Sequence, residues 1–148
     1  MVINVGMRYD QFNPDDEYIS DLVNPEGDRI KAENKNMYSP RFGISFPITE
    51  KGIVHFSYGH FYQMPTLRNL YKRSIFGANR SPTVGYANLN PEKTVQYEFG
   101  LQQQLSQFIA FDMSVYYKDV RDLLALQSIS YDSPKYGPSS YSVYLNKD

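Results

Sequence analysis

Cysteine and tryptophan are both absent from the 148-residue sequence. Without cysteine the chain has neither a disulfide framework nor a thiolate metal site. Charge of one sign is also missing, because 15 Lys and Arg residues nearly balance 16 Asp and Glu residues. Proteins that bind nucleic acid carry a basic excess or a basic stripe. No nucleic-acid partner is therefore expected.

Long hydrophobic runs are absent as well. A membrane-spanning helix needs about 18 or more consecutive apolar residues, whereas the longest runs here are as short as "FIAF" at 108–111 and "LLAL" at 123–126. The first ten residues, "MVINVGMRYD", lack the basic region and apolar core of a signal peptide. These absences exclude a helical membrane protein but leave a membrane β-barrel open, because its strands alternate and produce no strong hydropathy peak.

Aromatic residues are abundant, with 14 Tyr and 9 Phe, and this composition favours strands. Apolar and polar residues alternate with the period of two that is typical of a strand with two unlike faces. This alternation predicts strands over Val2–Phe12, Met37–Ile48, Ile53–Tyr62, Lys93–Leu105, Phe108–Val120 and Tyr141–Asn146.

The connections between these predicted strands alternate in length. Long polar loops are expected over 13–36, 63–92 and 121–140, and short turns at "PITEKG" and "LSQF". Outer-membrane barrels have this alternation, with short turns on one side of the membrane and longer loops on the other. Predicted strands of ten or more residues also suit the ~9–11 residues that a membrane strand needs. Strands of soluble sheets are usually shorter, at ~5–6 residues.

Two fold hypotheses explain the alternation. In a soluble β-sandwich, the apolar face of each sheet packs on a core and the polar face meets water, which would make the chain a carbohydrate-type binding module. In a barrel, the apolar side chains face lipid and the polar ones face the lumen. Because every strand offers the same large apolar face, we favour an all-β, antiparallel up-and-down meander of about six long strands, a slice of a transmembrane β-barrel.

Candidate site residues fall into two groups. The first consists of charged residues on the polar side of the predicted strands, expected to face the lumen and either to pair across strands or to line a substrate path: Arg8, Asp10, Arg41, Glu98, Asp112 and Lys118. The second lies at the end of a strand and in the loop after it, where recognition residues are common, and could touch a ligand: Tyr62, Arg68, Tyr71, Arg73 and Arg80.

No catalytic constellation stands out, so the chain is not expected to be an enzyme or to hold a metal or cofactor. The two histidines, His55 and His60, are an odd number of residues apart on one predicted strand and so point to opposite faces. An acidic group at Asp15, Asp16, Glu17 and Asp21 lacks the spacing and the glycine of a calcium loop. It is interpreted as a solvated acidic loop.

Two stretches resemble a known family. They are "FSYGHFYQMPTLRNLY" at Phe56–Tyr71 and "ANLNPEKTVQYEFGLQQQL" at Ala87–Leu105, where Pro91-Glu92-Lys93 precedes Tyr97-Glu98-Phe99-Gly100 at a specific spacing. "YSPRFGISFPI" at Tyr38–Ile48 fits the same pattern. These motifs resemble the barrel of TonB-dependent outer-membrane receptors.

The resemblance implies a location and partners. Such receptors lie in the outer membrane of Gram-negative bacteria, surrounded by lipid, and import a scarce nutrient such as a siderophore–iron complex, a cobalamin, a glycan or a peptide. Family members have a plug domain ahead of the barrel and an N-terminal segment that engages the TonB system. Residues 1–148 are expected to be part of such a barrel, without the plug domain and without the C-terminal strand.

Overall fold

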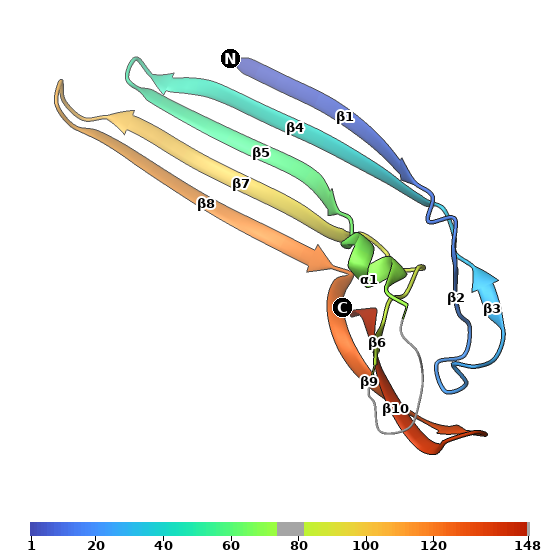
Figure 1. Cartoon of the computed structure of the whole chain (residues 1–148). Coiled ribbons are helices and arrows are strands. Elements are labelled where there is room, and N and C mark those ends of the chain that lie inside the picture. The colour runs from blue at the N-terminus through green and yellow to red at the C-terminus, as the bar shows by residue number, and fades with distance from the viewer. Residues whose placement is uncertain (74–81, 148) are drawn as a thin grey trace. The chain divides into compact units, whose positions relative to one another are not determined.

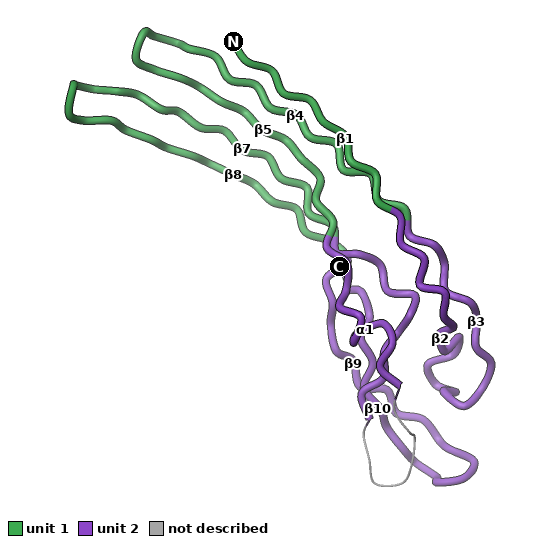
Figure 2. Tube along the Cα trace, turned by 45° about the horizontal axis from the view of Figure 1, so that its top comes forward, with its two compact units in different colours: residues 1–10, 36–62, 93–121 green, residues 11–35, 63–92, 122–148 purple. Residues whose placement is uncertain are grey.

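The computed structural model describes residues 1–73 and 82–147 and is mostly strand, with almost no helix (Figure 1). The elements are β1 Val2–Phe12, β2 Glu17–Ile19, β3 Arg29–Lys31, β4 Lys35–Thr49, β5 Gly52–Gln63, α1 Leu67–Tyr71, β6 Thr83–Val84, β7 Glu92–Gln104, β8 Ala110–Arg121, β9 Leu123–Ser133 and β10 Gly137–Lys147. The chain divides into two compact units, coloured separately in Figure 2. Unit 1 comprises residues 1–10, 36–62 and 93–121, and unit 2 comprises residues 11–35, 63–92 and 122–148.

Unit 1 is one five-stranded sheet with the strand order β1-β4-β5-β7-β8. Neighbouring strands run in opposite directions (Figure 1), so the sheet is an up-and-down meander. The two short connections, β4–β5 and β7–β8, lie at one end of this sheet, and the long segments leave it at the other end. The all-β antiparallel meander expected from the sequence is confirmed, and the sheet contains five strands.

The pairing register places apolar residues on one face of the sheet and polar residues on the other. Tyr97 faces Tyr117, and Phe99 faces Val115, on the apolar face. Gln96 faces Lys118 on the polar face. The same division continues in β4 and β5, where Phe42 pairs with Tyr58, Ile44 with Phe56, and Ser45 with His55.

Both faces of this sheet are uncovered within unit 1. Val5 is 79 % exposed and Val115 60 % exposed, although both are apolar. A β-sandwich would bury these side chains against a facing sheet, and unit 1 contains a single layer. Exposed apolar area on this scale marks a surface that contacts lipid or protein.

Unit 2 contains a three-stranded sheet with the order β6-β10-β9 and a β2-β3 hairpin. Its core is made of Ile19, Val84, Tyr131, Tyr141 and Val143. The Tyr131 and Tyr141 rings meet edge to face at a centroid distance of 5.8 Å, a favoured arrangement for aromatic pairs.

Two sequence expectations about the end of the chain are corrected here. The loop expected over 121–140 is wrong, because β9 begins at Leu123 and β10 at Gly137, and the two pair along their whole length. The strand expected at Tyr141–Asn146 exists within β10, but it pairs with β9 and β6 and therefore does not extend the five-stranded meander. One residue, Asp122 with φ 59°, separates β8 from β9.

The motif Asn88-Leu89-Asn90 connects several segments of unit 2. Leu89 is 1 % exposed. The Asn88 Oδ1 atom accepts hydrogen bonds from the Glu33 backbone N, at 3.1 Å, and from Lys35 Nζ, at 2.9 Å. The backbone N of Asn90 donates to Asn146 Oδ1 at 2.8 Å. The motif therefore connects the start of β4 with the end of β10.

Tyr141 makes the stability of unit 2 sensitive to high pH. Its hydroxyl donates to the Leu22 carbonyl at 2.8 Å. Burial, assisted by Asp21, raises the pKa of Tyr141 to about 12 from the ordinary 10. A raised folded-state pKa contributes stability that is complete below pH 10 and is lost as the pH rises through 12.

We therefore expect unit 2 to lose stability between pH 10 and pH 12. In Tyr141→Phe this pH dependence should be smaller, and the variant should be less stable than the parent at pH 8 because the Leu22 carbonyl loses its donor. Urea unfolding followed by near-ultraviolet circular dichroism across this pH range measures both effects. Tyr136→Phe, at an exposed tyrosine, is the control. An equal pH dependence in the parent and in Tyr141→Phe would contradict the assignment.

Candidate functional site

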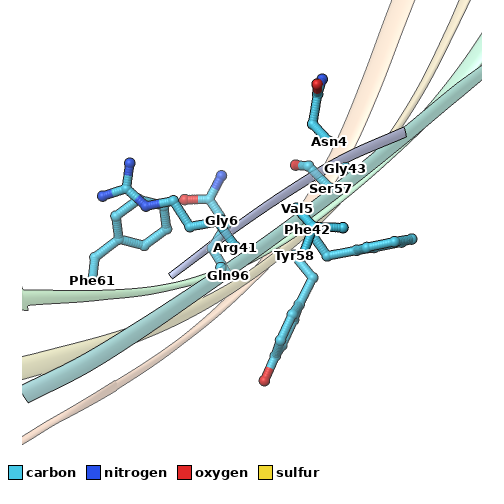
Figure 3. Close-up of a pocket in the computed structure, with 11 residues that line it drawn as sticks. Asn4, Val5, Gly6, Arg41, Phe42, Gly43, Ser57, Tyr58, Phe61 and Gln96 are labelled. Carbon is cyan, nitrogen blue, oxygen red and sulfur yellow. The ribbon is translucent and has the colours of Figure 1, made fainter. Parts of the chain in front are cut away.

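The polar face of unit 1 contains a hollow of about 380 Å³, lined from β1, β4, β5 and β7. Figure 3 shows Asn4, Ser57 and Arg41 on this side of the sheet, with Tyr58 on the other. The Arg41 guanidinium lies 4.9 Å from the centre of the Phe61 ring. This stacking holds a positive charge at the hollow. Among the described residues, no carboxylate forms an ion pair with Arg41.

The other charged residues predicted for the polar face have near neighbours. Arg8 pairs with Asp10 on the same strand at 2.7 Å. Gln102 Nε2 donates to Asp112 Oδ2 across strands at 2.9 Å. Lys118 lies over the Tyr116 ring at 5.2 Å.

Glu98 lies beside His55, with 3.7 Å between Glu98 Oε1 and His55 Nε2. The His55 ring fills the space where a side chain on Gly100 would be, so any larger residue at position 100 would collide with the imidazole. His60 instead contacts Tyr58, with 2.6 Å between His60 Nε2 and the Tyr58 hydroxyl. The two histidines thus lie on opposite faces, as the sequence predicts.

The residues predicted to contact a ligand do not form a single cluster in the structure. Tyr71 and Arg73 lie together in unit 2. Arg68 is exposed on α1. Tyr62 lies on the apolar face of unit 1, where its ring centre is 5.9 Å from Lys93 Nζ. Arg80 lies outside the described residues.

Tyr71 and Arg73 line a cavity of about 240 Å³ in unit 2, formed by β2, β3, the end of α1 and β6. The Arg73 Nη2 atom lies 2.8 Å from Asp16 Oδ1. The Tyr71 hydroxyl donates to the Pro14 carbonyl at 2.9 Å. Burial raises the pKa of Tyr71, and Asp16 and Asp15 raise it further, so this phenol stays protonated to a higher pH than an unperturbed tyrosine.

The charges around this cavity are mixed. Asp16 and Glu17 supply carboxylates, whereas Arg29, Lys72 and Arg73 supply cations. Tyr18 adds an aromatic ring that meets Tyr86 at a centroid distance of 5.0 Å. Such a lining offers donors, acceptors and an aromatic surface to a polar ligand.

The sequence alone did not identify the acidic side of this cavity. Asp16 was interpreted as part of a solvated acidic loop, yet it pairs with Arg73, 57 residues away. Neither spacing nor local pattern signals a contact between two segments so far apart. Arg29 was missed for the same reason, because only the β2–β3 pairing brings it beside Ile19.

Gly85 holds one wall of the cavity in place. A Cβ atom at this position would lie 2.5 Å from the Lys72 backbone N and 2.7 Å from the Leu70 carbonyl oxygen. These are backbone atoms of the chain just where α1 ends, and the Gly85 backbone N itself donates to the Lys72 carbonyl at 2.7 Å. Only glycine permits this approach.

We expect Gly85→Ala to separate the end of α1 from β6 at a cost of ~1–3 kcal/mol, the usual range for forcing extra atoms into a packed place. Trypsin should then cleave faster after Lys72 and Arg73, because those residues would be less firmly held. Gly6→Ala is the matched control, since a Cβ atom there would meet nothing within 4 Å. Equal cleavage rates in the two variants would show that the Gly85 contact is unimportant.

Two further properties concern metals and helices. Among residues 1–73 and 82–147, no group of three or more His, Asp or Glu side chains could hold a metal ion. In the same described part of the chain, no helix has the length and apolar character needed to cross a membrane.

Comparison with known proteins identifies one family. The family model "TonB dependent receptor-like, beta-barrel" matches residues 2–146, nearly the whole chain. No curated protein and no solved structure matches the chain significantly. Proteins of the matched family are receptors and transporters rather than enzymes. The match agrees with the meander, with its alternating faces and with the short turns at one end of the sheet. The chain therefore belongs to the β-barrel family of TonB-dependent receptors.

Proposed function

We propose that this chain is part of the wall of an outer-membrane receptor that takes up a scarce nutrient by TonB-dependent, energy-coupled transport. The observation that carries the proposal is the five-stranded single layer with an exposed apolar face on one side and a polar hollow on the other. In a barrel these two faces would meet lipid and lumen. The barrel itself performs no bond chemistry in this proposal.

The open edges of the sheet support a larger barrel. Among the described residues, β1 and β8 each have a neighbouring strand on one side only, so each presents an edge of unpaired N–H and C=O groups. Such groups must be paired in lipid. We propose that further strands complete the barrel and that a plug domain occupies its lumen and links it to the TonB system.

Nutrient recognition is assigned to the cavity in unit 2 that Tyr71 and Arg73 line. Its mixed charges and aromatic ring suit a polar ligand, and the four nutrient classes implied by the family resemblance all remain candidates. Separately, the polar face of unit 1, with Arg41 and Glu98, is proposed to line part of the substrate path through the lumen.

Uptake by cells tests this function. Cells producing the complete receptor should accumulate one ligand from a labelled panel of a ferric siderophore, cobalamin, an oligosaccharide and a peptide. A protonophore should abolish accumulation but leave surface binding intact, because energy enters from the inner membrane. Arg73→Gln should weaken surface binding, whereas Arg121→Gln, on the apolar face, should not. Accumulation that survives the protonophore would contradict energy-coupled transport.

A further inference from the structure

The apolar face of unit 1 changes character towards the end of the sheet from which the long segments leave. Here tyrosine rings replace the aliphatic and phenylalanine side chains. Tyr58 lies 5.0 Å from Tyr97, and Tyr97 lies 6.3 Å from Tyr117, measured between ring centres on three successive strands. Tyr9 and Tyr38 form a similar pair at 5.1 Å on β1 and β4. Amphipathic rings of this kind collect where hydrocarbon gives way to headgroups.

Beyond the tyrosines, two cations stand directly opposite each other on the same face. Lys93 pairs in register with Arg121, four residues along β7 from Tyr97 and four along β8 from Tyr117. Like charges at directly opposed positions destabilise a sheet. An arrangement of this kind is therefore more favourable when an anion lies between or above the two side chains.

The same strand supplies part of that negative charge. The Arg121 Nη2 atom lies 2.8 Å from Asp119 Oδ2 on its own strand. Across residues 1–73 and 82–147, no carboxylate forms an ion pair with Lys93 Nζ. The ammonium instead lies over the Tyr62 ring at 5.9 Å. Tyr62, Lys93 and Arg121 together form a row, which we call the basic row, along the ends of β5, β7 and β8.

We propose that the basic row binds the phosphate of an outer-leaflet lipid headgroup. The row shares its face with Phe99 and Val115, so a lipid whose acyl chains lie along that face would bring its headgroup to the row. Lys is an effective point charge for phosphate, and the planar Arg guanidinium can donate two parallel hydrogen bonds to its oxygens. The Tyr62 hydroxyl supplies a further donor on the same face.

This inference rests on the outer-membrane placement proposed above. It concerns the outward face, whereas nutrient recognition is assigned to unit 2. A variant of the basic row should therefore change lipid binding and leave energy-dependent uptake in place.

Binding of a fluorescent phosphatidic acid to the complete receptor in nonionic detergent, followed by fluorescence polarisation, tests the proposal. Lys93→Gln should weaken binding about fivefold, the change that corresponds to the ~1 kcal/mol of one cation near an anionic lipid surface. Lys93→Arg should restore it. Lys118→Gln removes the same charge from the opposite face of β8, beside Gln96, and should bind like the parent.

Several outcomes would overturn the proposal. Equal weakening by Lys118→Gln would show a general charge effect, and equal binding of a phosphatidylcholine probe would show that no exposed phosphate is recognised. Competition by inorganic phosphate at the concentration of the lipid probe would indicate a free-anion site. A heat-modifiability gel confirms that each variant is folded. If the parent receptor itself were not found in the outer-membrane fraction, that result would contradict the proposed function rather than the lipid-binding proposal.

Discussion

In plain buffer the 148-residue chain alone is expected to self-associate rather than behave as a monomer. In the part of the chain that the structure describes, the apolar face of unit 1 has no covering layer, and the outer strands β1 and β8 have open edges. Unpaired edges are templates for pairing with other chains, and large apolar patches are aggregation liabilities. Both contributions act in the same direction, so a large effect is expected.

Size-exclusion chromatography measures this behaviour. The chain should elute in the void volume or as broad oligomers without detergent and should disperse when detergent covers the apolar face. The same preparation with detergent above its critical micelle concentration is the control. A sharp monomer peak in plain buffer, with a cooperative thermal transition, would favour the soluble binding module that the sequence left open.

The second prediction with a large expected effect concerns arginine substitutions at two neighbouring residues of β8 whose side chains lie on opposite faces of the sheet. Val115 lies on the apolar face opposite Phe99, and Ser114 lies on the polar face opposite Gly100. Both are exposed within unit 1 and stand at nearly the same depth, close to the middle of the strand. In the complete receptor, Val115→Arg should destabilise the folded state in lipid by ~2–4 kcal/mol, the cost of an arginine facing lipid near the bilayer midplane.

Ser114→Arg is the matched control, because it introduces the same side chain towards the lumen, where polar groups are accommodated. Urea titration of folding into phosphatidylcholine vesicles reports both free energies. Similar midpoints for the two variants would argue against a lipid-facing role for Val115. A larger loss for Ser114→Arg would reverse the assignment of the two faces.

The long strands of unit 1 were predictable because their residues obey one simple rule. Within the predicted strand Val2–Phe12, residues 3–10 alternate without interruption, and β1 has the predicted bounds. β7 and β8 were likewise predicted to within two residues at each end, since Phe99 and Val115 sit among regular alternating neighbours. A two-residue period is enough to assign both the strand and its faces.

The elements of unit 2 were harder to predict, because their stability depends on contacts between distant segments. β9 starts with the apolar run Leu123–Leu126 and continues with serines at positions 128 and 130. Neither face of this strand is therefore apolar along its whole length. Its strand conformation depends on pairing with β10 over eleven residue pairs. The β6 strand is only two residues long and pairs parallel with β10, 59 positions away at Thr83 and Ser142.

The candidate site was predicted in part. Tyr71 and Arg73 were selected as loop residues that could touch a ligand, and they do lie together in a cavity. Asp16, their acidic neighbour, was assigned to solvent because charge runs usually are solvated. Tyr62 was grouped with the loop residues, but the period of β5 places it on the face of Tyr58, beside Lys93. The residue pattern therefore contained the correct face for Tyr62, whereas the pairing of Asp16 with Arg73 required the fold.

The most direct test of the lipid-facing assignment is a spin-label scan along β8 in the complete receptor reconstituted into lipid. This chain contains no native cysteine, so single cysteines placed in turn at positions 111 to 118 can each be labelled selectively if the remainder of the receptor is also free of reactive cysteine. Our account predicts that labels at 111, 113, 115 and 117 collide mainly with lipid-soluble oxygen, and that labels at 112, 114, 116 and 118 collide mainly with a water-soluble nickel complex. Accessibility without a two-residue period, or with the two sets exchanged, would contradict it.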